Sequence, residues 1–322
     1  MPGPCFDGSA DGNACNTCSR HLEGSWIQSN YSASSRYNIP FELWRRAGLA
    51  NLTSKEHHYG LCDDIDPRRA MFEWLPSRCH LRPFSRGAWC QVLLKKAQSI
   101  LFVGDSICQQ HFLSLVLLLD GRLGKNAANG RSLTDITASA CGGAIRLNFV
   151  RSDSLLWTVH TWELTWLSKC DRSMLGSMFV GRAVLRADLV VLGLGHHLLR
   201  MMPEHEAFTV NLLKQTLNLM VKLRSQRGLS PSSVIVVGAP APVPHCAQYS
   251  APISLAAYHR ALNEPQPLRG FVSPPWHMRL WARQPRFNSI GRQLAIQSGA
   301  SYIEVDRLAA RRPDSAMVCL SP

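Results

Sequence analysis

The sequence predicts an α/β fold with a mostly parallel central sheet covered by helices. Short runs made almost entirely of apolar residues recur along the chain and end in a glycine or an acidic residue, as expected for strands buried on both faces. Segments with helical spacing of apolar residues separate these runs. The chain has 322 residues, of which 46% are hydrophobic, so it is long enough to bury a sizeable core.

The elements are expected in the second part of the chain. Residues 1–90 are rich in Gly, Ser, Asn, Pro and Cys, which predicts a loop-rich N-terminal segment packed on a main domain at 91–322. The first strand is expected at 99–103, followed by a helix at 107–119. Further strands are expected at 188–192, 233–237 and 301–305, and further helices at 208–223 and 290–298. Alternating strands and helices indicate a doubly wound sheet, whose sites lie outside the carboxyl ends of the strands.

The charge balance leaves several kinds of partner to consider. Thirty-five Lys and Arg against 22 Asp and Glu give a formal charge of +13. The basic residues are scattered, without zinc-finger spacing or an RNA-binding signature, so we expect no nucleic-acid partner. A basic surface of this kind suits solvent, acidic glycans or anionic membranes. No apolar run reaches the roughly 18 to 20 residues of a membrane-spanning helix, so no transmembrane segment is expected.

Cysteines and sequons indicate the secretory pathway. The chain has 11 cysteines, many for a reducing compartment, and the sequons at Asn30 and Asn51 lie in its N-terminal third. We therefore expect disulfides and a glycoprotein. The start lacks a signal-peptide pattern, so no export signal or anchor is visible in this chain: either it lies outside the chain or there is none. Cys15 and Cys18 are not followed by a second such pair, so no metal site is expected.

The tripeptide Gly104-Asp105-Ser106 stands where the first strand gives way to a helix. A serine hydroxyl in such a turn projects at the carboxyl end of the strand, and the helix N–H groups can stabilise an oxyanion. Asp-Ser before an apolar helix is also an ordinary helix cap. By itself the tripeptide fits both a nucleophile and a cap.

The surrounding motifs resemble a known family. FEWLPSRCHLRPF at 72–84, ILFVGDS at 100–106, the Gly-His pair at 195–196 and IEVDRL at 303–308 are similar to the blocks of the plant trichome birefringence-like proteins. These proteins belong to the PC-esterase branch of the GDSL/SGNH hydrolase superfamily. The resemblance covers roughly residues 60–322.

The resemblance implies an SGNH-like three-layer α/β/α fold and a serine-dependent O-acetyltransferase or esterase of the Golgi lumen. Its expected substrate is cell-wall or other polysaccharide, and its reaction passes through an acyl-enzyme on Ser106. No cofactor is implied beyond an acyl donor such as acetyl-CoA or another acetylated compound. The implied site consists of catalytic Ser106, Asp314 and His196, of oxyanion-binding Gly104, Gly143 and Gly195, and of substrate-binding Asp105, Gln109 and His197.

The chain departs from the family pattern in ways that bear on catalysis. The family's Asp-x-x-His block has no full counterpart. In one alignment Asp314 matches and Met317 stands where the histidine belongs. In the other, Asp314 belongs to an upstream element and the chain stops before that block, so the domain would be truncated. His196 matches a family position that is not the general base, which leaves a second hypothesis: a catalytically impaired relative that acts as a glycan-binding or structural protein.

Overall fold

The structure is a computed structural model. It describes residues 24–28, 72–77, 84–124, 135–152, 183–195, 206–240, 251–263 and 283–309.

A seven-stranded sheet forms the centre of the fold, in the order β4-β5-β6-β3-β7-β8-β9. β3, β6, β7, β8 and β9 are parallel, while β5 pairs antiparallel with both β4 and β6. The strands are β3 (Ser99–Gly104), β4 (Arg122–Leu123), β5 (Asp135–Ala140), β6 (Ile145–Arg151), β7 (Leu189–Gly193), β8 (Val234–Val237) and β9 (Ser301–Ile303). The predicted α/β class with a mostly parallel sheet is confirmed.

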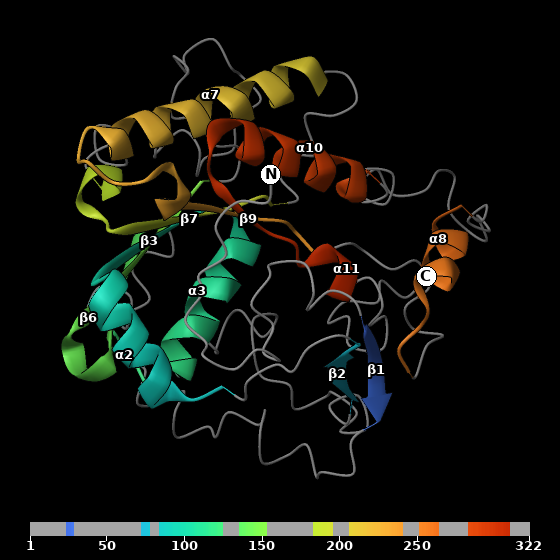
Figure 1. Ribbon diagram of the computed structural model, residues 1–322, viewed down its shortest axis with the longest axis horizontal. Helices are drawn as coiled ribbons and strands as arrows, with labels where there is room; N and C mark the ends of the chain where they lie inside the picture. Colours follow the sequence, from blue (N-terminus) through green and yellow to red (C-terminus); the bar gives the residue numbers. More distant parts are fainter. Residues whose placement is uncertain are drawn as a thin grey trace.

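Helices cover both faces of this sheet (Figure 1). They are α2 (Arg86–Lys96) and α3 (Ser106–Leu118) on one face, and α7 (Glu206–Ser225) and α10 (Gln284–Ser298) on the other. Alternate residues of β3 enter the two cores because successive strand side chains point to opposite faces. Ile100 and Phe102 pack with the α2 and α3 side, whereas Leu101 and Val103 pack with the α7 and α10 side.

Most predicted elements lie where the sequence places them. β3, β7 and β8 match the predicted strands, and α3 and α7 match the predicted helices to within a few residues. β9 ends at Ile303, two residues earlier than expected, and α10 begins at Gln284, six residues earlier. The strands β5 and β6 were not predicted.

The N-terminal segment holds regular structure as well. β1 (Gly24–Gln28) and β2 (Phe72–Pro76) form an antiparallel ribbon in which Trp26 faces Trp74, and Figure 1 draws this ribbon apart from the main sheet. The predicted boundary at residue 90 falls inside α2. The remaining elements are α8 (Leu255–Asn263), α11 (Asp306–Ala309) and the 3-10 turns η7 (Cys141–Gly143) and η10 (Pro231–Ser233). Within the described ranges, no helix is long and apolar enough to cross a membrane.

Candidate functional site

The strand order identifies one place in the sheet where a ligand site is expected. Among the parallel strands, the first in the chain, β3, lies between the second, β6, and the third, β7. After β3 the chain adds β6 on one side, and it then adds β7 on the other side, so the strand order reverses between β3 and β7. Doubly wound sheets bind ligands outside the carboxyl ends of their strands at this point. Ser106 follows β3 and Gly195 follows β7, so both lie there.

Ser106 is the first residue of α3 and is partly exposed. The preceding Asp105 has extended backbone geometry and caps the helix: its Oδ1 accepts hydrogen bonds from the backbone N–H groups of Ile107, at 2.9 Å, and Cys108, at 3.5 Å. Among the residues that the structure describes, none forms a hydrogen bond with the Ser106 hydroxyl. Asp105 is therefore the N-cap of α3, and the Ser106 hydroxyl is not needed to cap the helix.

The same cap decides which helix N–H groups could stabilise an oxyanion. The first N–H groups of a helix have no partner inside it. Asp105 occupies those of Ile107 and Cys108, and the described part of the chain supplies no acceptor for the N–H of Ser106. The Ser106 N–H, at the positive end of a 13-residue helix, is thus the donor that α3 offers to a developing negative charge.

Glycines at the ends of β3 and β7 let the strands approach the start of α3. A Cβ at Gly104 would lie 2.6 Å from the Cβ of Cys108, and one at Gly193 would lie 2.5 Å from it. A Cβ at Gly195 would lie 1.8 Å from Asp105 Oδ2. Gly104 and Gly195 therefore both lie close to the start of α3, which carries Ser106. Their proposed role in binding an oxyanion stays a prediction, because packing alone requires glycine at both positions.

Gly143 was predicted as an oxyanion donor and this prediction is wrong. It belongs to η7, which joins the end of β5 to the start of β6. β6 is parallel to β3, with Arg146 opposite Ser99, so η7 lies at the amino end of β3 and Ser106 at its carboxyl end. The length of β3, roughly 17 Å, separates them. The glycine is explained by its φ of 92° in a tight turn.

Two predicted substrate-binding side chains are buried. Asp105 is 1% exposed and Gln109 is 7% exposed. Asp105 Oδ1 caps α3, and its Oδ2 is buried with no hydrogen-bond partner among the residues that the structure describes. Neither side chain is exposed enough for a polymer to reach it. Both therefore pack at the start of α3 and do not contact a polysaccharide.

The remaining predicted site residues lie outside the described residues. These are His196 and His197, which follow Gly195 in the chain, and Asp314 near its end. Their roles stay predictions.

No sequence motif points to His111, which lies on the same helix as Ser106. Burial lowers the pKa of His111, and the charge of Asp105 opposes this effect. Five residues along a helix correspond to a turn of roughly 140° and a rise of about 7.5 Å. His111 therefore faces a different side of α3 from Ser106 and is not its base.

Cys108 is also near the serine but is not a nucleophile. Its side chain is buried, and its Sγ donates to the carbonyl oxygen of Val103 at 3.4 Å. Burial, followed by the charge of Asp105, raises the pKa of this thiol. It stays protonated at neutral pH.

A side-chain amide fixes the next loop along the same edge. Asn288 of α10 donates from Nδ2 to the Ala239 carbonyl at 2.8 Å and accepts from the Ala239 N–H at 3.1 Å through Oδ1. Gln284 donates to the same Oδ1 at 3.0 Å. This clamp holds the backbone just after β8. Local sequence patterns could not identify it, because the partners are 49 residues apart.

Unpartnered polar atoms lie near the ends of β8 and β9. Tyr258 Oη, Tyr302 Oη and Asp306 Oδ1 are buried without a hydrogen-bond partner in the described structure. A Cβ at Gly238 would lie 2.5 Å from Tyr302 Oη. Burial and the charge of Asp306 raise the pKa of both tyrosines, so both phenols stay neutral. Within the described ranges, no group of three or more His, Cys, Asp or Glu side chains could hold a metal ion.

Comparison with models of known protein families finds no match to this chain, and comparison with curated proteins finds none either.

Proposed function

We propose that this chain is a serine-dependent O-acyl transfer enzyme of the PC-esterase type, acting on acetyl groups of a polysaccharide. The observation that supports this most directly is the position of Ser106. Its hydroxyl is partly exposed, free of hydrogen bonds within the described residues, and located where a doubly wound sheet forms its site. The motifs around it resemble those of the PC-esterase branch, which is consistent with an SGNH-like arrangement of the three layers.

In the proposed reaction, Ser106 Oγ attacks the carbonyl carbon of an acyl donor. A bond forms between Oγ and that carbon, the donor's bond to its leaving group breaks, and the serine proton passes through a base to the leaving group. A sugar hydroxyl or water then attacks the acyl-enzyme and releases Ser106. The N–H of Ser106 would stabilise the oxyanion of each tetrahedral intermediate, a contribution of about 10²- to 10³-fold in rate for one such donor.

The base is part of the proposal and comes from the resemblance. His196 follows Gly195, whose backbone lies against Asp105 at the same edge of the sheet as Ser106. Asp314 is the acidic residue that the resemblance assigns. We likewise infer the polysaccharide substrate and the location in the Golgi lumen from the resemblance. The disulfide between Cys90 and Cys141 supports an oxidising compartment.

A second candidate function is a glycan-binding relative without catalytic activity. The observation that favours it is Met317, which stands in place of the family's histidine in one alignment. Losing one member of a catalytic triad lowers the rate by roughly 10⁴- to 10⁶-fold. Such a protein would keep the serine turn as an architectural feature.

A serine-directed phosphonate probe tests the proposal. We expect the probe to label the full chain at Ser106 and the Ser106→Ala variant not at all, because the probe reacts only with an activated hydroxyl. Ser114→Ala is the matched control, since Ser114 is an exposed serine on the same helix. Mass spectrometry of the labelled peptide identifies the site.

The outcomes separate the two candidates. Equal labelling of the unmodified chain and the Ser106→Ala variant would show that Ser106 is not the nucleophile. Absence of labelling together with retained binding to acetylated polysaccharide would favour the glycan-binding candidate. Loss of labelling in His196→Gln, with Ser114→Ala labelled normally, would identify His196 as the base.

A further inference from the structure

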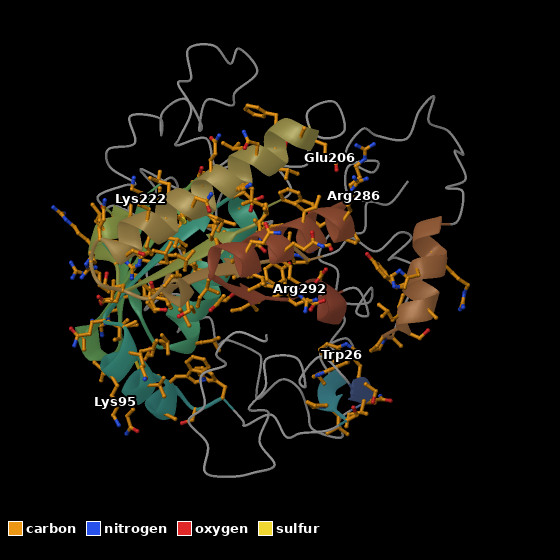
Figure 2. The ribbon with its side chains drawn as sticks, turned by 45° about the horizontal axis from the view of Figure 1, so that its top comes forward. Trp26, Lys95, Glu206, Lys222, Arg286 and Arg292 are labelled. Carbon is orange, nitrogen blue, oxygen red and sulfur yellow. A yellow bond between two sulfur atoms is a disulfide. The ribbon has the colours of Figure 1, made fainter. Side chains whose placement is uncertain are left out.

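One face of the sheet is uncovered over its antiparallel edge, which consists of β4, β5 and β6. On the α7 and α10 side, the apolar core draws on β3, β7 and β8, and among the described residues it includes none from β4 or β5. Figure 2 shows α7, labelled at Lys222, and α2, labelled at Lys95, on opposite sides of the sheet. Ala138 packs in the core on the α2 side, so its neighbours Thr137 and Ser139 point to the α7 side, where both are exposed.

Two arginines project from this uncovered face in one row. Arg122 of β4 is opposite Ser139 of β5, and Ser139 is opposite Arg146 of β6. Residues directly opposite in neighbouring strands have side chains on the same face, and all three residues are exposed. Opposite residues of antiparallel strands are alternately about 5.5 Å and about 4.5 Å apart, so the Cα atoms of the two arginines are about 10 Å apart with the serine between them. We name these three residues the arginine row.

The charges of the arginine row are not neutralised within the described part of the chain. None of its three side chains forms an ion pair or a hydrogen bond there. Asp120, just before β4, pairs with Arg86 at 2.7 Å, and Asp188, just before β7, lies 3.9 Å from Arg227. Asp135 stands four residues before the serine of the row along β5, about 13 Å away. The two arginines therefore create a local positive potential that attracts an anionic group.

The chemistry of the arginine row fits a carboxylate. A guanidinium group presents paired N–H donors that match the two oxygens of a carboxylate. The two arginine side chains are long enough to meet above Ser139, whose hydroxyl is a further donor. The row therefore offers donors from three adjacent strands to one anionic group.

A second row of polar side chains beside it suits the hydroxyl groups of a sugar. Thr137 and Asn148 are opposite each other, two residues along the strands from Ser139 and Arg146. Thr137 is exposed and Asn148 is partly exposed, and neither side chain forms a hydrogen bond with another described residue. The two rows are about 7 Å apart, a distance that one sugar ring with its carboxylate spans. A hydroxyl and an amide can each donate and accept hydrogen bonds, as sugar hydroxyls require.

We propose that the arginine row binds a uronic acid unit of an acidic polysaccharide, with the carboxylate on Arg122 and Arg146 and ring hydroxyls on Thr137 and Asn148. Among the described residues, the large exposed apolar side chains all lie outside β4, β5 and β6. The face therefore lacks the apolar groups that enter a lipid interface and the aromatic rings on which nucleic acid bases stack. Arg146 is opposite the first residue of β3, whereas Ser106 follows the last one, so this site is separate from the proposed catalytic serine.

Calorimetric titration of the full chain with trigalacturonate tests this proposal, which does not depend on the reaction at Ser106. We expect saturable binding of trigalacturonate and none of its fully methyl-esterified form, which keeps the sugar rings but has no charge. Arg122→Gln and Arg146→Gln should each weaken binding about fivefold, the upper end for an exposed ion pair, and together about 25-fold. Thr137→Val should weaken it about threefold, since it removes a neutral hydrogen bond but keeps the shape of the side chain.

The matched control carries Lys95→Gln and Lys96→Gln, which remove two exposed cations of α2, on the other side of the sheet. It should bind trigalacturonate like the unmodified chain, and equal thermal midpoints would show that all variants fold. Equal affinity for the acid and its ester, or no binding of either, would overturn the proposal with the unmodified chain alone. Equal losses in the two double variants would overturn it in favour of general charge attraction, and inorganic phosphate binding as tightly as trigalacturonate would overturn recognition of a sugar.

Discussion

Gly104 and Gly193, at the carboxyl ends of two neighbouring strands, both lie against Cys108. Their spacing leaves no room for another side chain, because a Cβ at either position would approach the Cβ of Cys108 to 2.6 Å or less. This close packing is a structural reason for glycine at position 193. It places α3, and with it Ser106, close to the ends of β3 and β7.

Gly193→Ala should destabilise the protein by about 1 to 3 kcal/mol, the usual cost of overpacking a dense core. Urea denaturation measures the free energy of unfolding. The control is Gly87→Ala in the first turn of α2, because a Cβ there meets nothing within 4 Å and alanine should therefore cost no stability. A Gly193→Ala protein as stable as the unmodified chain would contradict this account of the packing.

His111 gives the stability a defined dependence on pH. Its pKa in the folded protein is below its ordinary value of 6.5 because burial disfavours the charged imidazole. As the pH falls below 6.5, the unfolded chain binds a proton more readily than the folded one, so stability is lost. The loss stops once the pH is below the folded pKa.

Replacing the imidazole by an amide should therefore flatten this pH dependence. We expect the free energy of unfolding of His111→Gln to change less between pH 7 and pH 5 than that of the unmodified chain. Chemical denaturation at several pH values measures the difference. His259→Gln, at an exposed position on α8, is the control, and an unchanged slope in His111→Gln would contradict the assignment.

At the scale of elements, a buried arginine joins α7 to the start of β7. Arg224 is 0% exposed, and its guanidinium donates to the carbonyl oxygens of Val184, Ala187 and Asp188 and to Ser233 Oγ. Burial lowers its pKa to about 10, so it stays charged at neutral pH. Its partners are carbonyl dipoles at the end of a helical turn, which favour a cation.

Arg224→Met should lower the free energy of unfolding by about 3 kcal/mol or more. The methionine fills part of the volume but removes the donor to the Val184 and Asp188 carbonyl groups, at a cost of about 1 to 3 kcal/mol each, while Ala187 keeps a hydrogen bond from Arg227. Denaturant titration measures the change. Lys214→Met, an exposed position on the same helix, should change stability by less than about 0.5 kcal/mol. Similar losses in the two variants would show that the guanidinium contacts contribute little.

Some strands could be predicted from the sequence and others could not. β3, β7 and β8 are continuous apolar runs because helices cover both of their faces, and such runs are visible in the sequence. In β5 and β6 the burial alternates along much of each strand, as in Ile145, Leu147 and Phe149, which are buried while Arg146 is exposed. An alternating pattern is a weaker signal than a continuous apolar run, and it did not lead to a predicted strand at β5 or β6. β6 pairs with β3 in the centre of the sheet. Without β6, the order of the strands could not be predicted.

In the molecule as a whole, the disulfide between Cys90 and Cys141 ties α2 to the sheet. Cys90 of α2 and Cys141 of η7 are 51 residues apart. The bond therefore closes a loop that contains β3, α3, β4 and β5, and it fixes α2 against the turn before β6.

Removing this bond should lower the free energy of unfolding by about 4 kcal/mol, the chain-entropy estimate for a loop of this length. Denaturation of Cys90→Ser, of Cys141→Ser and of the double variant measures the loss. Each single variant should lose as much as the double variant, because either change breaks the same bond. A much larger loss in the double variant would indicate that side-chain packing dominates.

Local patterns in the sequence were enough to predict the α/β class, most strands and helices on the parallel part of the sheet, and the turn that carries Ser106. These features depend on residues close together in the chain: apolar runs, helical spacing and a capping aspartate before a helix. The tertiary structure alone decided that Gly195 lies beside Asp105, that Gly143 lies at the far end of β3, and that Asn288 holds the loop after β8. Each of these depends on strand order and register, which arise from contacts between distant segments, and no local pattern specifies them.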